Sequence, residues 1–128
     1  MDAISTTARH DTRVLSLISS GHFLSHFYQL SLPPLLLIWR DEFGVSYAAL
    51  GTVIALFGLA TGLAQIPAGI LVDRIGARPL LVGGLIIEAL AISAMGFAPS
   101  LEMIYVAAVI AGIGNSVFHP ADYAILNS

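Results

Sequence analysis

The chain has 128 residues, of which 57% are hydrophobic and only 10% are charged, and its formal net charge is −3 at pH 7. A soluble domain carries about 25% charged residues, so this composition cannot cover a protein surface in water. Five basic residues, all arginine, are too few for a nucleic-acid-binding surface, and the absence of cysteine excludes disulfide and thiol chemistry. The composition therefore predicts an all-α, polytopic membrane protein with the lipid bilayer as its solvent.

Four stretches of the chain reach the length of about 20 mostly apolar residues that a spanning helix needs. We expect these helices over residues 14–38, 47–72, 79–98 and 101–121, behind an N-terminal tail at 1–13. Four of the five arginines lie in the tail or between the second and third helices, and an excess of arginine marks the cytoplasmic side. The tail is therefore predicted to be cytoplasmic and the protein to lie in the inner (plasma) membrane.

The first stretch carries a polar stripe. Ser19, His22, His26, Gln29 and Pro33 follow one another at steps of three or four residues, which places them on one helix face. Polar side chains within a span face the protein interior or a water-filled cavity, so His22, His26 and Gln29 are candidates for a substrate cavity or proton relay. Structural hydrogen bonding is the alternative. Two histidines four residues apart also match metal-ligand spacing, but no third ligand is evident and no metal site is predicted. Pro33 and the proline after it are expected to kink or end the helix.

The second stretch has a face of small residues. Gly51, Ala55, Gly58, Gly62 and Gly69 recur along it at intervals that keep them on one side. Because glycine lets two helices approach closely in a membrane, this face is expected to contact another helix.

A short charged turn at residues 73–78 joins the second and third stretches. Asp73 can face the positive N-terminal end of another helix, and Gly76 permits a tight turn. Arg74 and Arg78 can pair with carboxylates or lipid phosphates. Taken alone, these residues indicate a solvated turn that orients the protein.

Glu88 lies at the middle of the third stretch. A charged side chain at the centre of a span costs about 2.5–3.5 kcal/mol on insertion scales. Gly84, Ala91 and Met95 share its face, which indicates contact with protein rather than lipid. We expect Glu88 to make a neutral structural hydrogen bond or to take part in proton coupling.

The fourth stretch brings polar residues onto one face again. Gly112, Asn115, His119 and Asp122 lie on this face, and Pro120 is expected to bend the helix. Asn115 and His119 are candidates for the wall of the same cavity. The alternative is a kinked packing helix that contains a buried histidine.

Two motifs resemble the major facilitator superfamily of transporters. Its signature loop between helices 2 and 3 is similar to the pattern of Gly69, Leu71, Asp73, Arg74, Gly76 and Arg78. The run from Gly112 to Pro120 resembles the fourth helix of the fosmidomycin-resistance-like subgroup. The resemblance implies a twelve-helix fold, with four helices here and their partner helices in the same protein beyond residue 128. It also implies that the loop glycines, Asp73 and the two arginines form a gate that latches the two halves together.

These observations predict transmembrane transport of a small solute by alternating access, coupled to protons. Neither enzyme activity nor a cofactor is expected, because the chain has no hydrolase-type nucleophile–base pair and no phosphate-binding glycine loop. Two alternatives stay open. One is a complete four-helix oligomeric exporter of the small multidrug type, and the other is a non-transporting membrane subunit or assembly factor. The expected partners are the solute and the bilayer, and nucleic acid is not among them.

Overall fold

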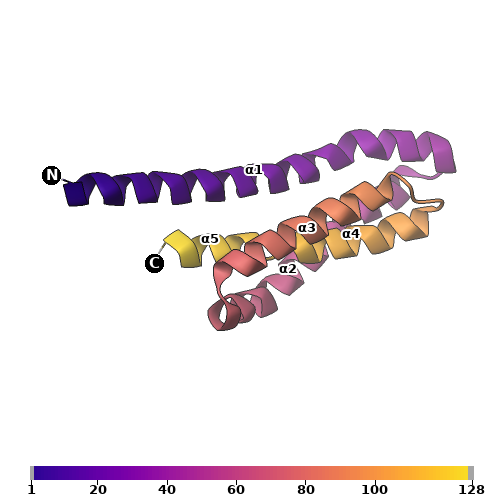
Figure 1. Ribbon diagram of the computed structural model, residues 1–128. Helices are drawn as coiled ribbons and strands as arrows, with labels where there is room; N and C mark the ends of the chain where they lie inside the picture. Colours follow the sequence, from indigo (N-terminus) through magenta and orange to yellow (C-terminus); the bar gives the residue numbers. More distant parts are fainter. Residues whose placement is uncertain (1, 127–128) are drawn as a thin grey trace.

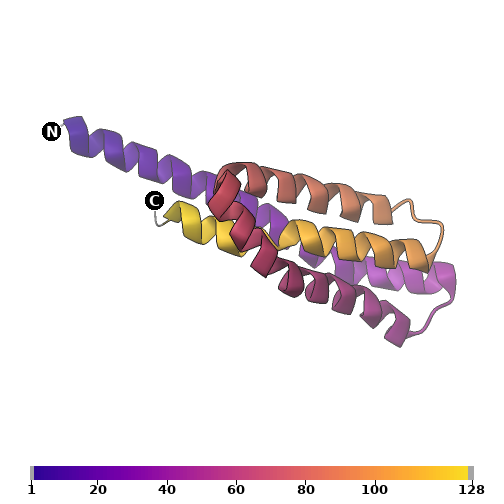
Figure 2. The ribbon, with the colours of Figure 1, turned by 90° about the horizontal axis from the view of Figure 1, so that it is seen from below.

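The computed structural model describes residues 2–126, and the side chains of residues 12–125, and every regular element in this part of the chain is α-helical. The helices are α1 (Asp2–Phe43), α2 (Tyr47–Ile75), α3 (Ala77–Met95), α4 (Leu101–Asn115) and α5 (Phe118–Leu126). α1 runs along one side of α2, α3 and α4, and α5 continues in the direction of α4 (Figures 1 and 2). Both ends of the chain lie at the end of the bundle where α2 turns into α3 (Figure 1). The prediction of an all-α protein is confirmed.

Among the described residues, three helical segments are long and apolar enough to cross a membrane: Tyr47–Ile75, Ala77–Met95 and Leu101–Ile125. Their outer faces expose large apolar side chains such as Ile66 and Leu90, which water would not stabilise but lipid does. α1 is longer than any of them, but its stripe of serine, histidine and glutamine lowers its hydropathy below theirs. A fourth span through α1 therefore stays a prediction, while the three apolar segments agree with an integral membrane protein.

The first connection is shorter than the sequence suggests. α1 does not end at Pro33 but continues to Phe43, and Gly44 then adopts the left-handed conformation with φ of 63°. The N–H of Gly44 donates to the carbonyl of Arg40 at 2.9 Å, which closes the helix as a C-terminal glycine commonly does. Two residues later the Ser46 hydroxyl accepts from the N–H of Ala49 and caps α2.

The turn between α2 and α3 consists of Gly76 alone. Its φ of 91° is a conformation that side chains with a Cβ rarely adopt, so glycine is required there. Its N–H donates to the carbonyl of Val72 at 2.9 Å. Asp73 and Arg74 consequently belong to the last turn of α2, and Arg78 to the first turn of α3, instead of forming a six-residue loop.

The fourth stretch is divided into two helices instead of forming one over residues 101–121. The break falls at Ser116 and Val117, four and three residues before Pro120. Proline has no N–H to donate to the carbonyl four residues earlier, and its ring clashes with that carbonyl. The Ser116 hydroxyl turns back to donate to the carbonyl of Ile113 at 2.7 Å, which satisfies part of the helix end.

α4 packs against α2 and α3 through glycine. A Cβ at Gly112 would meet the carbonyl oxygen of Phe57, and would lie 2.9 Å from the Ala60 Cβ on α2. On the other side, a Cβ at Gly114 would lie 2.7 Å from the carbonyl oxygen of Gly84 on α3. The backbones of three helices are therefore in direct contact, as small residues allow in membrane proteins.

The small-residue face of α2 lies away from these contacts. A Cβ at Gly51, Gly58 or Gly62 would have no atom of the described chain within 4 Å. α2 instead uses Val53 and Phe57, both buried, against the other helices. The expected close helix contact is therefore not made at these three glycines within the described residues, and only Gly69, at the end of the face, lies beside another helix.

Candidate functional site

α1 meets the other helices near its middle through two groups of hydrogen-bonded polar side chains. The residues come from α1, α3, α4 and α5, and together we call them the polar seam: His22, Ser25, His26, Gln29, Glu88, Asn115 and Asp122.

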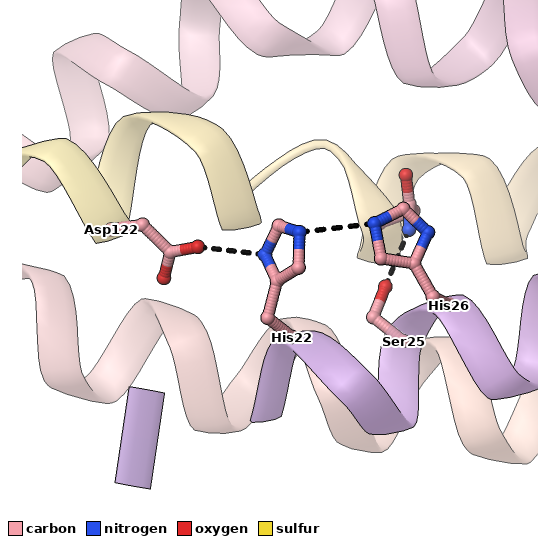
Figure 3. A network of polar contacts seen from close by, with 5 residues as sticks. His22, Ser25, His26 and Asp122 are labelled. Atoms are coloured by element: carbon pink, nitrogen blue, oxygen red, sulfur yellow. Dashed lines mark hydrogen bonds and ion pairs between the residues drawn. The ribbon is translucent and has the colours of Figure 1, made fainter. Parts of the chain in front are cut away.

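The first group begins with a pair between α1 and α5. Nδ1 of His22 lies 2.8 Å from Oδ2 of Asp122, a distance typical of a charge-assisted hydrogen bond (Figure 3). The Asp122 side chain is 14% exposed and that of His22 is 35% exposed, so the pair lies partly inside the protein. The second oxygen of Asp122, Oδ1, is buried and has no hydrogen-bond partner among the described residues.

His26 extends this group along α1 toward the exterior. Its Nε2 lies 3.0 Å from Nε2 of His22 (Figure 3), and its Nδ1 lies 3.3 Å from Oε1 of Gln29. The two imidazole rings meet edge to face, with centroids 4.6 Å apart. Asp122, His22, His26 and Gln29 therefore form a continuous chain that leads from a largely buried carboxylate to an exposed ring.

The hydrogens in this chain follow from the chemistry of imidazole, which in its neutral form has one N–H donor and one acceptor nitrogen. When Nδ1 of His22 donates to Asp122, its Nε2 is left to accept from Nε2 of His26. Neutral His26 then has no hydrogen on Nδ1. When His26 takes up a second proton, Nδ1 carries it and donates it to Gln29. One added proton at the exposed ring is thus linked to Asp122 through two hydrogen bonds.

The second group lies deeper in the protein and joins three helices. The Asn115 amide on α4 donates one hydrogen to the Ser25 hydroxyl on α1 at 2.7 Å, and the other to Oε1 of Glu88 on α3 at 3.2 Å. Glu88 is fully buried, as its face of small residues predicted, and Ser25 is 3% exposed. Oε2 of Glu88 has no hydrogen-bond partner among the described residues.

Four of the five predicted cavity residues belong to the polar seam, and the fifth lies beside it. The ring centroid of His119 is 5.9 Å from that of His22, and the side chain is exposed. Sequence reasoning missed Ser25 and did not assign a role to Asp122. The spacing did contain a signal for both, because Ser25 adjoins His26 and Asp122 shares the helical face of Asn115.

The predicted gating residues lie at one end of the bundle. Asp73, Arg74 and Arg78 are exposed, and none makes an ion pair with a side chain in the part of the chain that the structure describes. Gly69 faces α5, where a Cβ would lie 3.9 Å from the Pro120 Cβ. Gly76 forms the turn itself.

In the described part of the chain, no three histidine, aspartate or glutamate side chains are placed so that they could hold a metal ion together. The two histidines of α1 are instead hydrogen-bonded to each other.

Comparisons with known proteins point to one family. The family model described as Major Facilitator Superfamily matches residues 18–128. The chain is 31% identical over 121 residues to the "Fosmidomycin resistance protein" of Escherichia coli, which covers 92% of this chain and 29% of that protein. It is 28% identical over 119 residues to the "Probable L-galactonate transporter" of Escherichia coli, covering 93% of this chain and 26% of that protein. It is 34% identical over 84 residues to the "Multidrug resistance protein MdtH" of Aeromonas hydrophila, covering 60% of this chain and 21% of that protein.

The chain spans less than a third of the length of each of these relatives. No solved structure matches it significantly.

Proposed function

Because the chain belongs to the Major Facilitator Superfamily, we propose that the whole protein transports a small polar solute across the inner membrane by alternating access, coupled to protons. The observation that carries this proposal is the chain of hydrogen bonds from His26 through His22 to Asp122. Ionisable side chains are costly within a span and are retained where they line a pathway or move a proton.

The geometry supports proton coupling in a specific way. A proton that enters at the exposed His26 ring adds an N–H donor at Nδ1, toward Gln29, and its charge is balanced by Asp122 through His22. Asp122 lies on α5, which follows α4 after the break at residues 116 and 117. Protonation on α1 is therefore coupled to the position of a short helix that is separate from the packed part of α4.

Asn115, Ser25 and Glu88 belong to the same proposal as a second polar group on the pathway wall. Their hydrogen bonds join α1 to α4 and α4 to α3, beside the apolar packing of Leu32 and Trp39 of α1. Such bonds can be exchanged for bonds to a solute when the helices move, because hydroxyl and amide groups accept and donate to sugars and acids alike.

The test is a transport assay with the full-length native protein in proteoliposomes. L-Galactonate and fosmidomycin, which appear in the names of two relatives, are the first solutes to try. With a transported solute, we expect Asp122→Asn to lose uptake driven by a pH gradient but to keep solute counterflow, which needs no net proton movement. Asp41→Asn, an exposed carboxylate at the far end of α1, is the matched control. Gradient-driven uptake by Asp122→Asn at the normal rate would refute proton coupling through this pair.

The turn between α2 and α3 is proposed to act as the gate. Its exposed Asp73 has no partner within the described chain, so its partner is expected on helices of the other half of the protein. We expect Asp73→Asn to lower transport strongly while membrane insertion and amount of protein stay unchanged, with Asp41→Asn again as control. Wild-type transport by this variant would remove Asp73 from the gate.

Family membership disfavours the small multidrug exporters, which resemble this chain in no motif. A non-transporting subunit or assembly factor is separated from a transporter by the same assay, because it would move none of the solutes tried under any gradient.

A further inference from the structure

A groove of about 700 Å³ lies between the N-terminal half of α1, the first half of α3 and Ile125 of α5, and no residue of the polar seam lines it. Most of its wall is aliphatic, with side chains from both helices. These include Leu17 and Leu24 on α1 and Leu81 and Leu85 on α3. Such an apolar surface is suited to a hydrocarbon chain.

The charges of the groove are of one sign. Arg13 on α1 and Arg78 on α3 are the charged side chains that line it, and no carboxylate does. Both arginines are exposed, and neither forms an ion pair with a side chain among the described residues. The wall also carries the hydroxyl of Ser20, which donates to the Ser16 carbonyl of its own helix at 2.7 Å. The polar recognition available in the groove is therefore a pair of guanidinium groups.

Apolar walls combined with two arginines match one class of ligand. A guanidinium binds a phosphate oxygen pair with two parallel hydrogen bonds, and basic pockets between spanning helices bind the headgroups of anionic lipids. We propose that this groove binds one anionic phospholipid, with its phosphate held between Arg13 and Arg78 and an acyl chain lying along the leucines. This site shares Arg78 with the proposed gate, includes no residue of the polar seam, and does not depend on which solute is carried.

The position of the groove fits this occupant. Arg13 lies in the N-terminal third of α1, and Arg78 lies in the first turn of α3, two residues after Gly76. The N-terminal part of α1 and the turn from α2 into α3 lie at the same end of the bundle (Figure 1). Four of the five arginines of the chain belong to this end by sequence, and an arginine excess predicts the cytoplasmic side. The cytoplasmic leaflet carries a negative surface potential from its anionic lipids, which attracts basic side chains at that depth.

The experiment measures lipid retention by native mass spectrometry of the full-length native protein, extracted from nanodiscs of phosphatidylcholine and phosphatidylglycerol at 3:1. We expect one phosphatidylglycerol to be retained by the wild type. The double variant Arg13→Gln/Arg78→Gln should bind it roughly tenfold or more weakly, since each basic residue near an anionic surface contributes to binding. Arg40→Gln is the matched control, because Arg40 is exposed on the same helix but lies at its other end, over the Tyr47 ring at 4.4 Å.

Several outcomes would overturn the proposal. Unchanged retention by the double variant would show that the arginines do not hold the phosphate. An equal loss in Arg40→Gln would show that only overall charge matters. Displacement of the lipid by water-soluble glycerol 3-phosphate would show that the groove binds a free anion rather than a lipid. No retention by the wild type would show that another part of the protein fills the groove. All variants must unfold at the same temperature in pure phosphatidylcholine. This control confirms that a folding defect is not the cause of lost lipid retention.

Discussion

α4 and α5 contact the rest of the bundle in two different ways. Toward α2 and α3, the closest contacts are at Gly112 and Gly114, whose missing side chains let the backbones touch, and hydrogen bonds such as that from the Thr61 hydroxyl to the Gly112 carbonyl lie beside them. Toward α1, the contact is made by hydrogen bonds that end on Asn115 and Asp122. One contact is fixed by shape, and the other is made of groups that can exchange partners.

The difference follows from the solvent. Lipid tails are as apolar as leucine, so apolar burial does not by itself drive helices together, and close backbone packing supplies the stability instead. A packed glycine contact has one arrangement, because any shift produces overlap or a void. Interhelical hydrogen bonds in a membrane contribute less to the stability of the fold than this close packing does, and a change of protonation alters them. The polar seam is therefore the contact that we expect to open, and the glycine contact the one that we expect to stay.

The largest effect should come from filling the glycine contact. In Gly84→Ala, the new Cβ would meet the Val117 side chain and lie 2.6 Å from the carbonyl oxygen of Gly114, which is backbone and cannot rotate away. We expect the free energy of unfolding to fall by about 1–3 kcal/mol, the usual cost of overpacking. Thermal unfolding in detergent measures it. The control is the adjacent Gly83→Ala, where a Cβ would have no atom of the described chain within 4 Å. Equal losses in both variants would contradict a tight contact at Gly84.

A smaller effect is expected in the polar seam. Asn115→Ala removes two hydrogen bonds and leaves the buried Ser25 and Glu88 without that donor. Interhelical hydrogen bonds in membranes contribute about 0.6–1.7 kcal/mol, so we expect a loss of about 1 kcal/mol in the free energy of unfolding.

A double-mutant cycle of Asn115→Ala with Ser25→Ala isolates the bond between these two side chains. Ser19→Ala, at an exposed position on α1, is the control. If Asn115→Ala lowered the free energy of unfolding as much as Gly84→Ala, the distinction between the two contacts would fail, because the polar seam would then be as rigid as the glycine contact.

Much of the candidate site could be predicted from spacing. The steps of four and three from His22 to Gln29 placed these side chains on one face, and Glu88 had to face protein because of its charge. Spacing within a helix could not show that Asp122 lies beside His22, since the two are 100 residues apart and their distance depends on how α5 packs. It also could not show that His119 stays outside the hydrogen-bonded chain.

The sequence by itself determined the helical class, the membrane environment and the family. Hydrophobic length and the scarcity of charge are local properties, and the turn from Gly69 to Arg78 is a local pattern, so each could be read without a structure. The family match over residues 18–128 confirms that pattern. Only the tertiary structure decided which glycines are in contact. α2 and α4 both carry glycine at helical spacing, yet Gly112 and Gly114 of α4 leave no room for a Cβ, whereas Gly51, Gly58 and Gly62 of α2 have no atom of the described chain near them. The partner of a helix face is set by packing and not by the face itself.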